Sequence, residues 1–298
     1  MKALLSIAGC CVLAAGLAAS GIPSRAASEP MTNTSHRHRS AVIAGQLTGT
    51  ADAADLSVAI GFDLEKRLER WPCLEDAERI ALQRIVRETS SRGERSLVGA
   101  VMQKLDSDVV VTLGGSCKDG TIHLRVRLWT SPKSSPHFFA VSGSLAEFFA
   151  FQDELTERVV SAVRAIHPDL PAPTKADRLS LRPAESLDAY LLMIRGNIAL
   201  EKGNLSEAES SLHQALEREP GLWWAHYFLG AIEFHRGHFA QAIERCKRAL
   251  ALDADLYPAI YANMSYCYAG LGDSAEAGRC QAEFERRTGK RLPIRGLP

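Results

Sequence analysis

The stretch Gly196 to Pro220, GNIALEKGNLSEAESSLHQALEREP, decides the fold of the carboxy-terminal part of this chain. Small residues stand where the surface of a single helical hairpin would carry bulk, at Gly196, Gly203, Ala208 and Ala215. Their spacing predicts two helices in close contact, because larger side chains at Gly196 and Ala208 would hold the helices apart. Gly203 falls at the expected turn, where a left-handed backbone costs glycine little.

The same small residues return further along the chain. A shift of 34 residues leads to Gly230, Gly237, Ala242 and Ala249, and a further 35 residues lead to Ser265, Gly272 and Ala277. A two-helix unit repeated about every 34 residues is typical of the tetratricopeptide repeat. Residues 187–287 resemble that family.

The resemblance implies an all-α solenoid of helical hairpins, with repeats at about 189–222, 223–256 and 258–287. The positions expected to hold the hairpins together are Gly196, Ala208, Gly230, Ala242 and Ala277. Two positions depart from the family pattern: His226 replaces a large apolar residue, and Ala254 replaces the proline that closes a repeat.

In this family the first helices of the hairpins line a concave groove in which binding usually occurs. The resemblance places these residues in the groove: Tyr190, Met193, Asn197, Trp224, Tyr227, Phe234 and Tyr266. Such a groove is aromatic, and Tyr and Trp often anchor protein interfaces. The alternative is that Trp224 and Phe234 pack on neighbouring helices or on the first domain. Met193 and Ala259 occupy two places where some relatives carry the basic residues that clamp a peptide carboxylate, which disfavours a chaperone-tail receptor.

The region ahead of the repeats, residues 40–166, mixes strands and helices. Apolar residues four apart predict a helix over 52–71, and two further helical stretches follow at 74–88 and 96–107. Asp119-Gly120 predicts a hairpin between strands at 108–115 and 122–129. A strand at 137–144 and a helix at 145–166 complete an α+β, or mixed α/β, domain. A proline-containing linker at 167–186 separates this domain from the repeats, and residues 288–298 form a tail.

This order of elements resembles the TolB amino-terminal-like domain and its relatives in FlgO-type and CsgG-type envelope proteins. The best-matching part runs from Lys104 through the hairpin, together with the helix around FQDELTERVV. Cys73 and Cys117 depart from what that resemblance implies. A disulfide between them and two buried free thiols are both open alternatives.

The first 20 residues have the short positive start, apolar run and small-residue exit of a signal peptide. We therefore expect a periplasmic or secreted protein, with a flexible linker at 21–39 that includes the run His36-Arg37-His38-Arg39. Two alternatives associate the amino terminus with a membrane. The apolar run could serve as an anchor, or Cys10, in a lipobox-like context, could be lipidated.

Composition and motifs indicate which classes of function we do not expect. Lys and Arg total 35 and Asp and Glu total 35, so bulk charge gives no support for nucleic-acid binding. The chain lacks a Gly-rich phosphate loop and the GxSxG, HExxH and CxxC motifs, so we expect no enzyme activity, cofactor or metal. His235 and His238, with His226, are expected to be solvent-facing rather than metal ligands.

The sequence therefore predicts an exported adaptor or scaffold that binds another protein or peptide. One alternative is a structural component of an envelope complex, assembled as a homo-oligomer or with other proteins through the first domain. Another is a detached sensory domain of a regulator or cyclase system.

Overall fold

The computed structural model describes residues 38–71, 74–76, 79–174, 183–253, 257–289 and 291–292. The chain divides into two compact units, with the boundary at Pro183. We call residues 38–174 the α/β unit and the residues from Pro183 onward the helical unit. The predicted signal peptide, Cys10 and residues 21–37 of the predicted linker lie outside the described residues.

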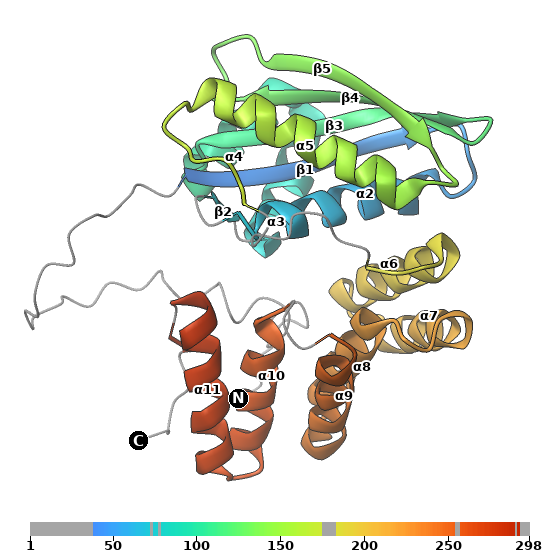
Figure 1. The fold of residues 1–298 in the computed structure, drawn as a ribbon, viewed down its shortest axis with the longest axis vertical. Helices are drawn as coiled ribbons and strands as arrows, with labels where there is room; N and C mark the ends of the chain where they lie inside the picture. The colour runs from blue at the N-terminus through green and yellow to red at the C-terminus, as the bar shows by residue number, and fades with distance from the viewer. Residues whose placement is uncertain are drawn as a thin grey trace, which may run out of the picture. The chain divides into compact units, whose positions relative to one another are not determined.

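A five-stranded sheet forms the centre of the α/β unit (Figure 1). In spatial order its strands are β2 (Leu74–Asp76), β1 (His38–Thr48), β3 (Val109–Lys118), β4 (Thr121–Trp129) and β5 (His137–Ser144). β1 runs parallel to β2 and β3, whereas β3, β4 and β5 form an antiparallel meander. Asp119 and Gly120 close the β3–β4 hairpin with φ angles of 51° and 71°. The predicted hairpin is thus confirmed, with the positive φ values that its two-residue turn requires.

Helices cover both faces of the sheet. They are α2 (Ala53–Leu68), α3 (Arg79–Thr89), α4 (Glu94–Leu105) and α5 (Phe148–Ile166), with a short 3-10 turn at Ser90–Arg92. Ala41 and Ile43 of β1 belong to an apolar cluster with α3 and α4, whereas the next residue of β1, Ala44, lies against Gly61 of α2. Because successive strand residues point to opposite faces, α3 and α4 cover one face and α2 the other. α5 packs against α2 and β5.

The boundaries of the α/β unit differ from the predicted ones at three places. Leu74–Asp76 was expected to start a helix but forms β2, because these residues pair with His38–Ser40. A three-residue strand is too short to show a period of its own in the sequence. β1 likewise begins at His38, inside the stretch expected to be a linker. Beyond α5, the Trp71 indole Nε1 donates to the Pro171 carbonyl oxygen at 3.2 Å, so residues expected to be linker also pack on this unit.

The helical unit consists of hairpins that follow one another along the chain (Figure 1). The hairpins are α6 (Leu187–Glu201) with α7 (Leu205–Arg218), α8 (Trp223–His235) with α9 (Phe239–Leu252), and α10 (Ala259–Gly270) with α11 (Ser274–Thr288). α7 contacts α8, and α9 contacts α10, so each hairpin packs on the next as in a solenoid. Within the described part of the chain, no helix combines the length and the apolar character needed to cross a membrane.

The turns inside the hairpins are alike. Gly203, Gly237 and Gly272 have φ angles of 82°, 79° and 79°. At each turn the next residue donates its backbone N–H to a carbonyl five positions earlier, as Asn204 does to Ala199 at 2.9 Å. This is the Schellman ending of a helix, and a residue with a Cβ atom would be strained at the left-handed position. The predicted role of these glycines is confirmed.

Candidate interaction site

The hairpins approach each other at the predicted small residues. A Cβ atom at Gly196 would lie 2.6 Å from Leu212 Cγ and 3.2 Å from the Ala208 carbonyl oxygen. A Cβ atom at Gly230 would lie 3.3 Å from the Ala242 carbonyl oxygen. In the third hairpin the Ser265 hydroxyl donates to the Ala277 carbonyl oxygen at 2.7 Å. Each first helix thus lies directly against the backbone of its partner, which confirms the facing contacts.

The residues predicted to line the groove lie on the first helices but are mostly buried. Tyr190, Met193 and Asn197 lie on α6, Trp224, Tyr227 and Phe234 on α8, and Tyr266 on α10. The exposed fraction is 5% or less for five of them: Tyr190, Met193, Asn197, Trp224 and Tyr227. Phe234 and Tyr266 are partly exposed. The predicted partner-binding role of the set stays a prediction.

Trp224 belongs to an aromatic cluster, which we define as Trp223, Trp224, Tyr227, Phe228 and Tyr257. The rings of Trp223 and Trp224 stack at 4.1 Å between centroids, and those of Trp224 and Tyr257 lie 4.7 Å apart. Tyr227 meets Tyr257 edge-on at 5.3 Å. Tyr257 lies between α9 and α10, so the cluster ties the second hairpin to the start of the third. For Trp224, packing on neighbouring elements is therefore what the structure shows.

Tyr257 was not among the residues singled out in the sequence. It lies in a connection between helices, where neither helical periodicity nor the repeat pattern marks a core position. Its contribution is visible only once α8 and the start of α10 are folded against each other.

The two partly exposed residues lie at different places. Phe234 is near the end of α8, where its ring lies 5.6 Å from that of Phe239 on α9. Tyr266, on α10, packs against the small cluster of Ala262, Phe284 and Leu292. Both side chains thus combine a fixed position with accessible surface.

His226 shows how α8 accommodates its departure from the family pattern. The side chain is 5% exposed, and its Nε2 atom lies 3.3 Å from the Pro220 carbonyl oxygen. Burial lowers the pKa of His226, which favours the neutral ring inside the array. The expectation that His226 faces solvent is therefore wrong. His238 instead is exposed and lies 2.8 Å from Glu233.

The cysteines of the helical unit are buried thiols. Burial raises the pKa of Cys246, Cys267 and Cys280, to about 12 for Cys267 and about 11 for Cys280. High-pKa buried thiols react slowly, so these residues act as small apolar side chains. In the α/β unit Cys117 is buried, whereas Cys73 lies outside the described residues, so a disulfide between them and two free thiols both stay predictions.

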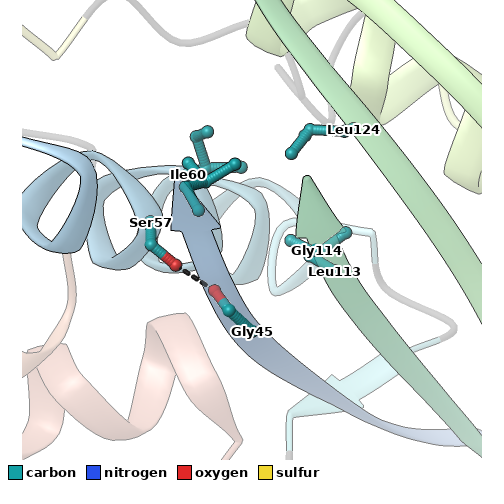
Figure 2. A pocket seen from close by; sticks show the side chains of 7 residues that line it. Gly45, Ser57, Ile60, Leu113, Gly114 and Leu124 are labelled. Atoms are coloured by element: carbon teal, nitrogen blue, oxygen red, sulfur yellow. Dashed lines mark hydrogen bonds between the residues drawn. The ribbon is translucent and has the colours of Figure 1, made fainter. Parts of the chain in front are cut away.

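One pocket of the α/β unit opens where β1 is irregular. The register with β3 shifts between Ala44 and Leu47, and the Ser57 hydroxyl of α2 donates to the Gly45 carbonyl oxygen there (Figure 2). The open space at this pocket, counted with adjoining solvent, is about 150 Å³, and its lining residues are Gly45, Leu47, Ser57, Ile60, Leu113, Gly114 and Leu124. Small-molecule sites usually measure about 300–1,000 Å³. This pocket is smaller, and its lining carries no ionisable group.

The family comparison agrees with the geometry of the hairpins. Residues 199–262 match the family model described as tetratricopeptide repeat. The helical unit is a tetratricopeptide repeat region. The match spans the end of α6 through the start of α10, and repeats of this kind form protein-interaction scaffolds. The resemblance of residues 40–166 to the TolB amino-terminal-like domain stays a prediction.

Two solved structures are similar to part of this chain. The first TPR of Spaghetti (RPAP3), bound to the HSP90 peptide SRMEEVD, is 20% identical and has a TM-score of 0.35, with coverage of 37% of this chain and 88% of that one. The MamA protein is 16% identical and has a TM-score of 0.32, with coverage of 52% of this chain and 88% of that one. Similarity at this level carries no argument about ligands. No curated protein matches the chain.

Proposed function

We propose that this protein is an exported, non-enzymatic adaptor whose tetratricopeptide repeats bind a segment of another protein. The observation that carries the proposal is the stack of hairpins with partly exposed aromatic side chains, Phe234 and Tyr266, on two successive first helices. Aromatic side chains held in place by packing lose little entropy when they are covered, which makes them good anchors for a partner.

The buried residues and the accessible ones have different roles in this proposal. The aromatic cluster around Trp224 and Tyr257 fixes the second hairpin relative to the third. Phe234 and Tyr266 then supply contact area. Replacement of Trp224 or Tyr227 is a poor test of binding, because loss of a buried ring disturbs the repeat array itself.

The binding test uses quantitative pull-down from envelope extract with the Phe234→Ala/Tyr266→Ala double variant. The matched control is Leu271→Ala, which removes an apolar side chain that is 53% exposed in the turn between α10 and α11. Thermal unfolding of each variant shows whether the repeats stay folded. We expect specific partners to be lost from the double variant and kept by the control. Retention of every partner by a folded double variant would refute the role of these two residues.

Export and the absence of enzyme activity are further parts of the proposal. The support for export is the signal-like sequence of residues 1–20. Mass spectrometry of the mature amino terminus tests it: cleavage near Ser20 is expected, a lipidated Cys10 would indicate a lipoprotein, and an intact terminus would contradict processing.

A second candidate is structural assembly through the α/β unit. β5 is at an edge of the sheet, and its Phe138 side chain is 55% exposed. An exposed edge strand can pair with a strand of another chain. Mass measurement over a range of concentrations tests this idea, because a protein that stays monomeric at high concentration does not self-assemble.

A further inference from the structure

We propose that His38, His167 and Asp169 form a binding site for one divalent transition-metal ion, with Zn²⁺ as the representative ion. The three residues come from distant parts of the chain. His38 is the first residue of β1, His167 directly follows α5, and Asp169 lies in the turn after it. One potential ligand atom from each lies within 4.8 Å of the other two.

The distances fit one ion better than they fit ordinary hydrogen bonds. His38 Nε2 lies 3.6 Å from Asp169 Oδ2, beyond the usual hydrogen-bond range. Two ligands of a tetrahedral zinc ion lie about 3.4 Å apart, because each bond measures about 2.0–2.1 Å. The Asp169 side chain is 73% exposed, so it is free to make the small adjustment that closes the site.

His167 supplies an independent observation. Its ring packs on that of His38 at 4.3 Å between centroids, with an angle of 44° between the planes. His167 Nε2 is buried and has no hydrogen-bond partner in the part of the chain that the structure describes. Buried polar atoms normally have a partner, so an unpartnered imidazole nitrogen beside a second histidine and a carboxylate suits a bound cation.

Asp108 lies beside the other ring nitrogen of His38. His38 Nδ1 lies 3.6 Å from Asp108 Oδ2, on the side of the ring away from the atom that faces Asp169. A histidine that binds a metal through one nitrogen commonly directs its other nitrogen to a carboxylate, which orients the ring. Asp108 also accepts the backbone N–H of Arg39 at 2.8 Å, which fixes this carboxylate next to β1.

The charges and ligand types indicate the class of ion. Asp108 and Asp169 together balance a divalent cation, and imidazole with carboxylate suits zinc and similar first-row metals rather than calcium. Three protein ligands leave a fourth tetrahedral position for water. An ion here would join the start of β1 to the segment after α5 and so close the α/β unit.

The test is calorimetric titration of the full chain, without a histidine tag, with ZnCl₂. We expect saturation at one Zn²⁺ per chain, and at least tenfold weaker binding in His167→Ala and in Asp169→Asn. The Asp169→Asn change is at an exposed position, so it tests the site even where His167→Ala fails to fold. The matched control is His137→Ala, which removes an exposed histidine from β5 and should leave the affinity unchanged.

Thermal unfolding supplies a second readout. In the full chain, Zn²⁺ should raise the temperature at which the α/β unit unfolds in the wild type and in His137→Ala, but not in Asp169→Asn. Absence of Zn²⁺ binding would overturn the proposal. The proposal would also be overturned if His167→Ala and Asp169→Asn both bound Zn²⁺ as tightly as the wild type, or if His137→Ala weakened Zn²⁺ binding as much as they do.

Discussion

The space around three helical glycines predicts that alanine at each of them changes the free energy of unfolding by a different amount. A Cβ atom at Gly196 would lie 2.6 and 2.8 Å from Leu212 Cγ and Cδ2, which forces a displacement. At Gly230 the nearest atoms would lie at 3.3 Å, so small adjustments suffice. At Gly278 on α11 nothing lies within 4 Å.

Two effects set the magnitudes. Alanine favours a helix over glycine by about 1 kcal/mol, and overpacking of a well-packed contact costs about 1–3 kcal/mol. We expect Gly196→Ala to lower the free energy of unfolding by up to about 2 kcal/mol. Gly230→Ala should lie near zero, and Gly278→Ala should raise it by up to about 1 kcal/mol. For a repeat region of this size, 1 kcal/mol corresponds to about 4–8 °C in the unfolding temperature.

A double-mutant cycle isolates the clash. Leu212→Ala alone removes a fully buried side chain and should cost about 2–5 kcal/mol. In that background the added methyl group at Gly196 meets a cavity instead of Leu212. Gly196→Ala should then become neutral or stabilising. The assay is chemical unfolding followed by circular dichroism at the helical signal. Equal stability of Gly196→Ala and Gly278→Ala would refute close packing at this site, and so would an equal cost of Gly196→Ala with and without Leu212→Ala.

Three further results are expected. Arg67 is fully buried and donates to Asp63 at 2.6 Å. Arg67→Met leaves Asp63 without this partner, so denaturant titration should show a free energy of unfolding lower by about 3–5 kcal/mol. The second change Asp63→Leu should recover much of that loss. Burial raises the pKa of Asp63 to about 6 despite Arg67, so the folded state holds the proton more tightly than the unfolded state. Stability relative to Asp63→Asn should therefore fall as pH rises from about 4 to 6, by up to about 1.4 kcal/mol per pH unit; a rise would contradict this sign. A thiol reagent should leave the buried cysteines of the native protein unlabelled and should label them only after the chain unfolds, as measured by mass spectrometry. These cysteines are Cys117, Cys246, Cys267 and Cys280.

The sequence predicts the repeat fold well because the relevant interactions are local. The left-handed turn at Gly203 and the contact of Gly196 with Ala208 involve residues close together in the chain, and the 34-residue period repeats them. In the α/β unit the Asp119-Gly120 hairpin is local in the same sense. β2 is different, because Leu74–Asp76 become a strand only through pairing with residues more than 30 positions away.

The candidate groove was harder to predict for a related reason. The repeat pattern states which positions lie on a first helix, and it does so correctly for Tyr190, Trp224 and Tyr266. It does not state which side chains remain accessible, because exposure depends on residues outside the pattern. Tyr257 is such a residue, and its contacts with Trp224 and Tyr227 place both in a packed cluster.

The surroundings of His38 in the α/β unit also depend on residues that are distant in the sequence. In the sequence it belongs to a polar run of histidines and arginines and lies 129 residues before His167, so no ligand spacing connects the two. The sheet supplies the connection. β1 begins at His38, next to the place where α5 ends, and this brings both rings to 4.3 Å. Metal-ligand sets assembled from strand starts and helix ends therefore escape motif searches, although each residue type is visible. The absence of a metal motif in this sequence thus gave no ground for excluding a site of this kind.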